Sequence, residues 1–172
     1  ASPTGGTASV DLNGGATQLG NFAIPVTGDW QKWETISRTV TLNAGSYNLG
    51  VFAQTGNWNF NWIEVVPNTP ISSSSSSSSA PKWSLLVQAE EYSSYYDTTA
   101  GNTGGAYRKD NVDIETNNDQ GTGYNVGWID ATEWLAYNNI TIPSSGTYTI
   151  SMRVASPAGG TAAIDLNGGT IP

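Results

Sequence analysis

Tryptophan side chains in predicted turns are the residues of this chain with the clearest capacity for chemistry. Trp30 and Trp33 lie three positions apart in the segment GDWQKW, and Trp58 lies in the loop GNWN. A flat aromatic ring can stack on the C–H face of a sugar, and a few hydrogen bonds can then orient the sugar hydroxyls. In an extended segment, a spacing of three puts two side chains on opposite faces. We therefore predict that Trp33 is buried and that Trp30, beside a Gly-Asp turn, is exposed.

Paired carboxylates could in principle cleave a glycosidic bond, and the chain offers Asp130 with Glu133 and Asp113 with Glu115. Such pairs arise by chance in a chain with 14 acidic residues. The chain has no His to act as a general base and no Cys to act as a nucleophile. It also lacks a G-x-S-x-G motif and a phosphate-binding glycine loop. The sequence therefore predicts a binding protein rather than an enzyme.

The charge of the chain excludes other classes of partner. The formal net charge is −8 and the isoelectric point is near 4.1, whereas binding to nucleic acid requires a basic face. No apolar run approaches the roughly 20 residues of a membrane-spanning helix. Only 12% of the residues are charged, and the seven Trp accompany many Gly, Ser, Thr and Asn residues. This composition is typical of an all-β domain with many turns.

Apolar and polar residues alternate with a period of two along most of the chain, and the alternating runs are separated by turns such as Asn-Gly-Gly. No segment has a sustained helical period. The sequence therefore predicts strands at residues 1–12, 19–24, 30–42, 47–54, 59–66, 85–92, 107–115, 124–129, 133–142 and 147–154.

A repeat and a linker divide the chain. Residues 155–169, ASPAGGTAAIDLNGG, repeat residues 1–15, ASPTGGTASVDLNGG, almost without change. Residues 68–82 contain a run of eight serines, which is typical of a flexible linker. We expect the chain to consist of residues 1–67, this linker and residues 83–172, and to start and stop partway through two similar modules.

Several stretches resemble the family 6 carbohydrate-binding modules, namely VQAEEY, GYNVGWIDATEWLAYNNITIPSSGTYTISMRVAS, the repeated ASP-GG-DLNGG strand, GDWQKW and NWNFNWIEV. Residues 83–153 resemble the N-terminal half of such a module, and residues 1–67 resemble the C-terminal half. The resemblance implies a β-sandwich of jelly-roll type, assembled from two halves in permuted order. Residues 105–115, GAYRKDNVDIE, resemble more specifically the modules attached to agarases.

The resemblance implies a non-catalytic module that anchors a secreted polysaccharide hydrolase to its glycan. The polyserine linker resembles the tethers of such extracellular enzymes. Agarose or neoagaro-oligosaccharide chain ends are the first expected ligand. Xylan, cellulose and β-1,3-glucan are alternatives within this class, and a structural or adhesion spacer without a ligand is an alternative outside it.

The same resemblance implies the residues of the sugar site. Trp30 and Tyr107 are expected to be opposing aromatic platforms, and Asn61 is expected to hydrogen-bond the sugar. Trp58 is expected to form a further wall, because exposing a Trp without a purpose is costly. Asn59 shares a face of its strand with Asn61 and is a further candidate. The other tryptophans of the strands are expected in the core: Trp33, Trp62, Trp128 and Trp134.

Gln88 and Glu90 lie two positions apart and therefore on one face of a predicted strand. The resemblance implies that this face, together with Glu64 near the end of the other half, holds a structural Ca²⁺. Oxygen atoms are the ligands that Ca²⁺ requires. The acidic loop of residues 110–119 is expected to be solvated rather than to hold a second ion.

Neither half alone can bury two sheets, so the halves must pair. A random coil of residues 68–82 spans roughly 20–25 Å, and a domain of this size has a radius of gyration of about 14 Å. Pairing within one chain is therefore feasible, and exchange of halves between two chains, which gives a swapped dimer, is the alternative. Two copies of the repeat compete for one strand position. We expect residues 1–15 to occupy it and residues after about 158 to be displaced.

Overall fold

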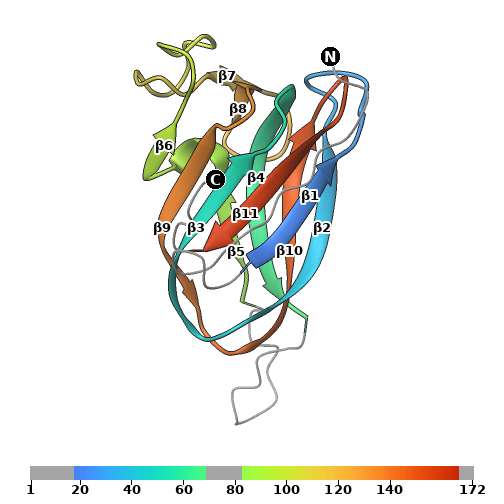
Figure 1. Ribbon diagram of the computed structural model, residues 1–172, viewed down its shortest axis with the longest axis vertical. Coiled ribbons are helices and arrows are strands. Elements are labelled where there is room, and N and C mark those ends of the chain that lie inside the picture. Colours follow the sequence, from blue (N-terminus) through green and yellow to red (C-terminus); the bar gives the residue numbers. More distant parts are fainter. Residues whose placement is uncertain (1–17, 69–82, 167–172) are drawn as a thin grey trace.

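The computed structural model describes residues 18–68 and 83–166, which form two β-sheets packed face to face (Figure 1). The expected all-β sandwich is confirmed. One sheet, in spatial order, consists of β1 (Gln18–Ile24), β11 (Gly160–Leu166), β3 (Gly45–Ala53), β9 (Trp134–Ile142) and β6 (Ser94–Tyr96). The other consists of β2 (Glu34–Leu42), β10 (Gly146–Ala155), β4 (Trp58–Pro67), β8 (Tyr124–Ile129) and β7 (Ile114–Thr116), with β5 (Leu85–Gln88) paired to β4.

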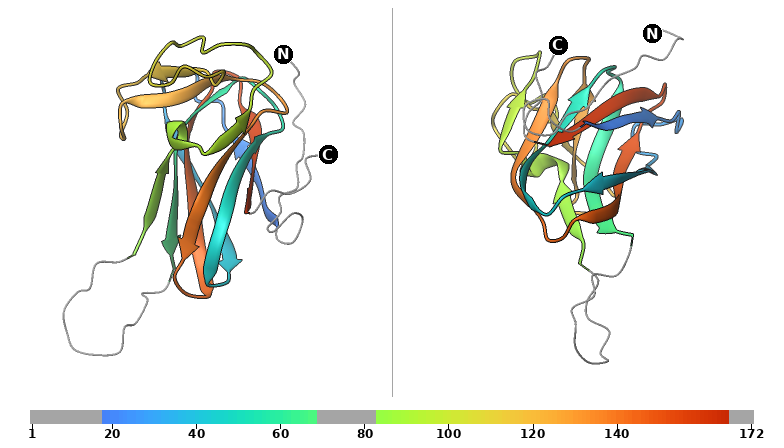
Figure 2. Two further views of the ribbon diagram at one scale, coloured as in Figure 1. Left: turned by 90° about the vertical axis from the view of Figure 1, so that its left-hand side faces the viewer. Right: turned by 60° about the horizontal axis from the view of Figure 1, so that its bottom comes forward.

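Both sheets combine strands from the two halves of the sequence (Figure 2). β10 lies between β2 and β4, and β3 lies between β11 and β9. All of these pairings are antiparallel, and β10 keeps an unbroken register with β2 from Gly146↔Leu42 to Val154↔Glu34. One chain therefore supplies every strand of the sandwich. The described part of the chain contains no helix long and apolar enough to cross a membrane.

The second copy of the repeat occupies the contested strand position. Residues 160–166 form β11 between β1 and β3, and the side chain of Ile164 is fully buried. The expectation that residues after about 158 are displaced is therefore wrong, while residues 1–15 lie outside the described residues. The second copy is also the better core strand. It buries Ala163 and Ile164 where the first copy has Ser9 and Val10, and each buried methylene stabilises the fold by about 0.8 kcal/mol.

The core between the sheets follows the alternation that the sequence predicts. In β10 the inward side chains, all almost completely buried, are Tyr148, Ile150, Met152 and Val154. Between them, the side chains of Thr149, Ser151 and Arg153 are partly exposed on the outer face of the sheet.

Three predicted strands are shorter than expected. β2 begins at Glu34 because the preceding residues form a turn, and residues 85–92 divide into β5 and the 3₁₀ helix η1 (Ala89–Glu91). Of residues 107–115, only the last two belong to a strand. Tyr107 has a φ of 61°, which is far from the values of a regular strand. The loop before β7 is instead held by Asn102, whose Oδ1 accepts hydrogen bonds from the amides of Gly105 and Ile114.

Candidate functional site

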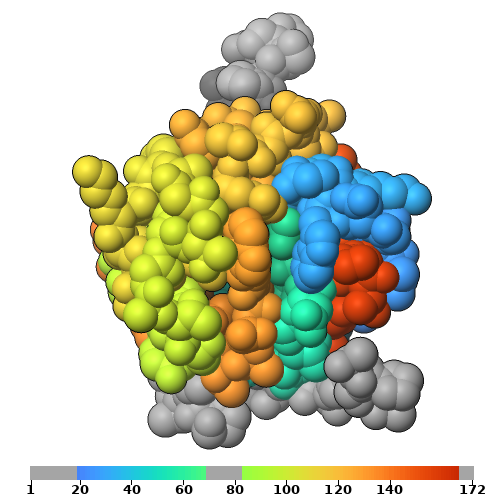
Figure 3. Space-filling model, turned by 90° about the horizontal axis from the view of Figure 1, so that it is seen from above, coloured from blue at the N-terminus to red at the C-terminus, as the bar shows by residue number. Residues whose placement is uncertain are grey.

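A pocket of about 190 Å³ lies at the loop end of the sandwich, where the segment before β2 meets β4, β7 and β8. Figure 3 looks down on this end and shows the blue segment before β2 against the amber and orange residues of β7 and β8. The pocket is lined by Trp30, Asn59, Glu115 and Trp128. Trp30 is 42% exposed and Trp128 is 48% exposed, so both indoles are open to solvent.

The turn that carries Trp30 is fixed by hydrogen bonds from both of its sides. The amide of Thr27 donates to the carbonyl of Ser156 over 2.8 Å, and the amide of Gln31 donates to Asp29 Oδ1 over 2.9 Å. Asn59 Nδ2 donates to the carbonyl oxygen of Trp30 itself over 3.0 Å. The expectation that Trp30 is exposed is confirmed, and the backbone of its turn is held by these hydrogen bonds.

Trp128 faces the pocket because the backbone of β8 departs from regular strand geometry. Alternation would put Trp128 on the same, inward face as Val126, which is 3% exposed. Trp128 instead has a φ of 48°, in the left-handed region, and the register between β8 and β4 shifts between Trp58 and Phe60. Left-handed backbone costs a non-glycine residue about 1–3 kcal/mol and is concentrated at functional sites. The expectation that Trp128 belongs to the core is wrong for this reason.

The floor of the pocket is a carboxylate held by amide groups. Glu115 Oε1 accepts hydrogen bonds from Asn59 Nδ2 at 2.9 Å, from Gln31 Nε2 at 2.8 Å and from Asn125 Nδ2 at 3.3 Å. Asn59 is 2% exposed and Asn125 is fully buried, so this network is rigid. Among the described residues, Glu115 Oε2 has no hydrogen-bond donor and is free to accept one from a ligand. Two exposed indoles above one fixed acceptor are suited to a ring that carries both C–H faces and hydroxyl groups.

The remaining predicted sugar residues lie away from this pocket. Trp58 is 1% exposed, and its Nε1 donates to the carbonyl of Thr55 over 2.7 Å, so the expectation that it forms an exposed wall is wrong. It fills the core because the bulged end of β4 turns its ring inward against Phe60. Asn61 is fully buried, and its Nδ2 donates to Asp119 Oδ2 and to a backbone carbonyl.

Tyr107 is 50% exposed, but it does not line the pocket. Its hydroxyl donates to Glu91, and its ring lies 5.0 Å from that of Tyr124. The structure therefore brings together Trp30 and Asn59 of the predicted set and replaces Tyr107 with Trp128. Of the other tryptophans expected in the core, Trp33, Trp62 and Trp134 are half-buried.

The acidic pairs that could resemble a glycosidase dyad have structural partners. Glu133 is 8% exposed, and its two oxygens accept hydrogen bonds from the backbone and hydroxyl of Thr98 and from the amide of Asp130. Burial raises the pKa of Glu133. Asp113 is 4% exposed and accepts from the amide of Thr103. The pocket itself contains a single carboxylate, which does not provide the two groups of a hydrolytic site.

Three buried oxygens gather beside the loop between β7 and β8. Gln88 Oε1, Glu90 Oε2 and Asn61 Oδ1 have no hydrogen-bond donor among the described residues. Gln88 Oε1 and Asn61 Oδ1 both face Gly121, where an added Cβ would lie 2.8 Å and 3.3 Å from them. Thr122 donates to the other oxygen of Glu90, and burial raises the pKa of this carboxyl. Unpaired buried oxygens are costly, so this cluster fits a cation with oxygen ligands.

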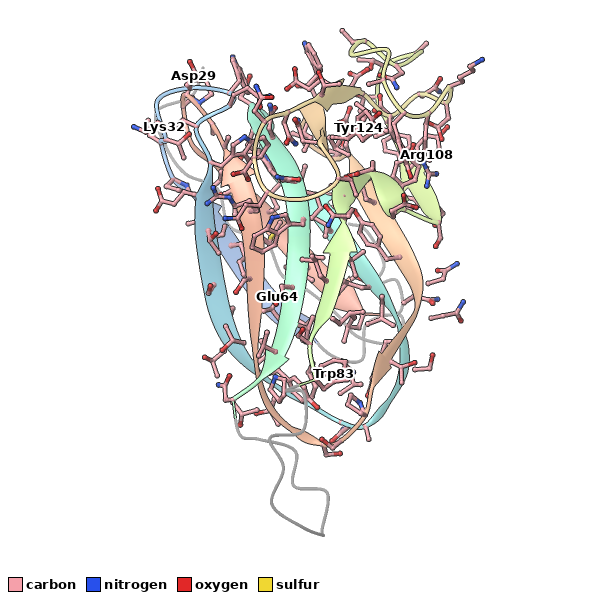
Figure 4. All side chains as sticks on the ribbon, turned by 180° about the vertical axis from the view of Figure 1, so that it is seen from behind. Asp29, Lys32, Glu64, Trp83, Arg108 and Tyr124 are labelled. Carbon is pink, nitrogen blue, oxygen red and sulfur yellow. The ribbon has the colours of Figure 1, made fainter. Side chains whose placement is uncertain are left out.

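The oxygens of Glu64, the third predicted metal ligand, are not among the buried side-chain oxygens that lack a hydrogen-bond partner in the described part of the chain. Glu64 pairs with Leu86 of β5, two residue pairs beyond the Trp62↔Gln88 pair. Figure 4 shows Glu64 on the middle of β4. The acidic loop residues are also dispersed, because Asp110 accepts from Tyr92, Asp119 pairs with Arg153 and Glu115 forms the pocket floor. Among the described residues, no three acidic side chains are grouped as a metal site.

Comparison with known proteins agrees with this architecture. The family described as carbohydrate binding module (family 6) matches residues 1–67 and 103–171. The clotting factor G alpha subunit of Tachypleus tridentatus is 42% identical over 168 residues, which is 97% of this chain and 22% of that relative. No solved structure is significantly similar to the chain. The comparisons support the family and do not support the narrower resemblance to agarase-attached modules.

Proposed function

The chain belongs to the family 6 carbohydrate-binding modules, and we propose that the pocket between Trp30 and Trp128 is where it binds a neutral glycan. The observation that carries this proposal is the pair of exposed indoles over the fixed carboxylate of Glu115. Each indole offers a stacking face to a sugar ring, and Glu115 Oε2 accepts a hydrogen bond from a hydroxyl. The carboxylate also repels a ring that carries a negative charge, which favours neutral sugars.

We propose β-1,3-glucan as the first ligand and retain agarose as the second. The similarity to a clotting factor subunit lowers the rank of agarose, since that relative is not named as an agar-degrading enzyme. The shape of the site agrees with it. Chains of β-1,3-glucan are curved, whereas cellulose is a flat ribbon that is better suited to a flat aromatic surface. A pocket of about 190 Å³ walled by two indoles suits a curved chain or a chain end.

The proposed role is to hold a larger protein on a polysaccharide, which raises the local concentration of the glycan for a linked domain. The chain spans 22% of the relative that it matches, so the identity of any linked domain is part of the proposal. We propose an extracellular location for two reasons. Polysaccharides of this class are found outside cells, and polyserine linkers are typical of secreted proteins.

We also propose that the oxygens of Gln88, Glu90 and Asn61 hold a structural Ca²⁺. These oxygens are buried, they lack donors among the described residues, and they come from two separate segments, β4 and the continuous stretch of β5 and η1, that the ion would join. The role of Ca²⁺ here would be to neutralise Glu90 and to fix the loop at Gly121 against β4 and β5. Asn61 replaces Glu64 in this ligand set.

Affinity electrophoresis tests the proposed binding function. The wild-type protein and the variants Trp30→Ala, Trp128→Ala and Tyr107→Ala are run in gels with laminarin, agarose, xylan or hydroxyethylcellulose. We expect retardation by laminarin, a β-1,3-glucan, and a loss of affinity of about 10-fold or more in the two pocket variants. Tyr107→Ala is the matched control, because it removes an equally exposed aromatic side chain from outside the pocket.

Retardation by agarose alone would keep the site and replace the ligand. A loss of retardation in Tyr107→Ala, with Trp128→Ala unaffected, would refute the assignment of the pocket. No retardation by any of the four glycans would refute the binding function and favour a spacer without a ligand.

A further inference from the structure

One triplet of the chain, Asn139-Ile140-Thr141, has the Asn-x-Ser/Thr pattern at which secreted proteins of eukaryotes receive an oligosaccharide. It is the single triplet of this pattern in the sequence. The sugar is attached to the side-chain amide of the Asn, and it is bulky and hydrophilic. A modified Asn must therefore lie on the surface of the folded protein, and the fold decides whether Asn139 does.

A β-bulge in β9 turns Asn139 away from the core. In the pairing of β9 with β3, the two residues Asn138 and Asn139 occupy a stretch in which β3 has a single residue. The flanking side chains of Tyr137 and Ile140 are in the core, with 2% and 6% of their surface exposed. Strict alternation would put Asn139 on the inward face with Tyr137. The extra residue instead leaves both Asn138 and Asn139 exposed.

The side-chain amide of Asn139 is free to carry a substituent. Asn139 has a φ of 62°, in the left-handed region, which Asn adopts more readily than most other non-glycine residues. Its amide forms no hydrogen bond with any residue that the structure describes. By contrast, the side-chain amides of Asn59, Asn61 and Asn125 are buried in hydrogen-bonded networks. The triplet thus falls on an exposed amide that has no structural role of its own.

The edge of β9 beside Asn139 is open. β6 pairs with β9 only from Trp134 to Ala136, and the amide of Asn138 donates to Ser93 Oγ over 3.1 Å at the end of this pairing. Past that point, no strand in the described part of the chain pairs with this edge of β9 (Figure 1). An open edge can pair with a strand of another molecule, and a bulky hydrophilic substituent beside it hinders such pairing.

The triplet also lies apart from the proposed sugar pocket. The pocket is built from the other sheet and the segment before β2, whereas β9 belongs to the sheet of β3 and β6. Asn139 is five residues beyond Trp134 at the loop end of β9, which is about 17 Å along the strand. An oligosaccharide on Asn139 is therefore attached outside the face that carries Trp30 and Trp128.

We infer that Asn139 is an N-glycosylation site, modified when the chain is secreted from a eukaryotic cell. The inference rests on the proposed extracellular location, because the transfer takes place during secretion. The co-reactant is an oligosaccharide carried on a polyprenyl diphosphate. Asn139 Nδ2 forms a bond to C1 of the sugar and loses one proton, while the C1–O bond breaks and the diphosphate leaves with the electron pair. Thr141 supplies the hydroxyl of the recognised triplet and is not itself modified.

The test is intact-mass spectrometry of the whole chain, secreted from a eukaryotic cell line behind an added leader sequence, before and after treatment with peptide-N-glycosidase. We expect the wild-type chain to exceed the 18.1 kDa of its sequence by one oligosaccharide, which the enzyme removes while converting Asn139 to Asp. Asn139→Gln and Thr141→Ala should both lose the oligosaccharide, and Thr141→Ala does so without changing the residue with left-handed backbone. Asn138→Gln is the matched control, because it changes the adjacent exposed amide and keeps the triplet. It should remain modified, as should Thr141→Ser.

The outcomes distinguish the modification from sugar binding. A wild-type chain secreted at its sequence mass would overturn the site, as would an enzyme-sensitive oligosaccharide that persists in both Asn139→Gln and Thr141→Ala. Laminarin retardation is measured on the same samples and should be equal for the modified wild-type chain and for Thr141→Ala. If neither is retarded while Asn139 carries the oligosaccharide, the proposed function fails and the modification site stands.

Discussion

We expect that removing the proposed structural Ca²⁺ destabilises the protein by an amount that can be worked out from its three proposed oxygen ligands. Gln88 Oε1, Glu90 Oε2 and Asn61 Oδ1 are buried without a donor among the described residues, and each such acceptor costs about 1–3 kcal/mol when nothing satisfies it. Loss of the ion should therefore cost at least about 3 kcal/mol. For a domain of this size, 1 kcal/mol corresponds to about 3–5 °C in melting temperature. We expect a drop of about 10 °C or more on chelation.

The assay is differential scanning calorimetry with 1 mM Ca²⁺, with excess EDTA, and with Ca²⁺ restored after EDTA. Glu90→Gln keeps the shape of the side chain and removes its charge, so the melting temperature of this variant should no longer respond to Ca²⁺. Glu64→Gln is the matched control, because Glu64 lies two residue pairs beyond Gln88 and its oxygens are not among the buried ones without a partner in the described part of the chain. Its response to Ca²⁺ should equal that of the wild-type protein.

Two results would refute this reasoning. A wild-type melting temperature that ignores both EDTA and Ca²⁺ would show that the three oxygens are satisfied in another way. A response that disappears in Glu64→Gln and persists in Glu90→Gln would show that a different set of residues binds the ion.

Three further predictions concern the fold. Trp58→Ala should cost about 3–5 kcal/mol in urea unfolding because the indole is 1% exposed, whereas Trp128→Ala should cost less than about 1 kcal/mol; equal losses would contradict the burial of Trp58. Deleting residues 1–15 should shift the melting temperature by less than about 3 °C, because β11 supplies the strand that they duplicate; a drop above about 10 °C would show that the first copy contributes to the core. The lowered pKa of Asp119 stabilises the folded state above the unfolded-state value of about 3.9, and this contribution is lost as pH falls through the lower folded-state value. Arg153→Ala should therefore lose less stability than the wild-type protein between about pH 5 and pH 2 in unfolding experiments; an identical pH profile would refute the ion pair.

Much of the fold follows from the local pattern of the sequence. Alternating apolar residues and Gly- or Asn-containing turns are sufficient to place β1, β3, β4, β8, β9 and β10, because a strand shows its side chains to its two faces with a period of two. The conformation of the longer loops does not follow from this pattern. Residues 101–113 contain strand-forming side chains, but left-handed residues and the hydrogen bonds of Asn102 keep their backbone out of the sheet.

The candidate site depends on tertiary structure more than the positions of the strands do. Trp30 could be predicted because a turn beside it exposes the side chain, and Asn59 because it lies near the loop end of a strand. The sequence predicts Trp128 in the core of a strand and Trp58 exposed in a loop, and the structure reverses both, because alternation indicates a side chain's face only where the strand is regular. The left-handed backbone at Trp128 and the register shift in β4 exchange the two.

The sequence by itself therefore determined the all-β class, most strands, the family and one exposed tryptophan of the candidate pocket, Trp30. Tertiary structure decided which copy of the repeat completes the sheet, and it joined Glu115 to Asn59 and Gln31, which are 56 and 84 positions away. The physical reason is that strand patterns are set by neighbours along the chain, whereas a binding pocket is set by the register between strands that are distant in the chain.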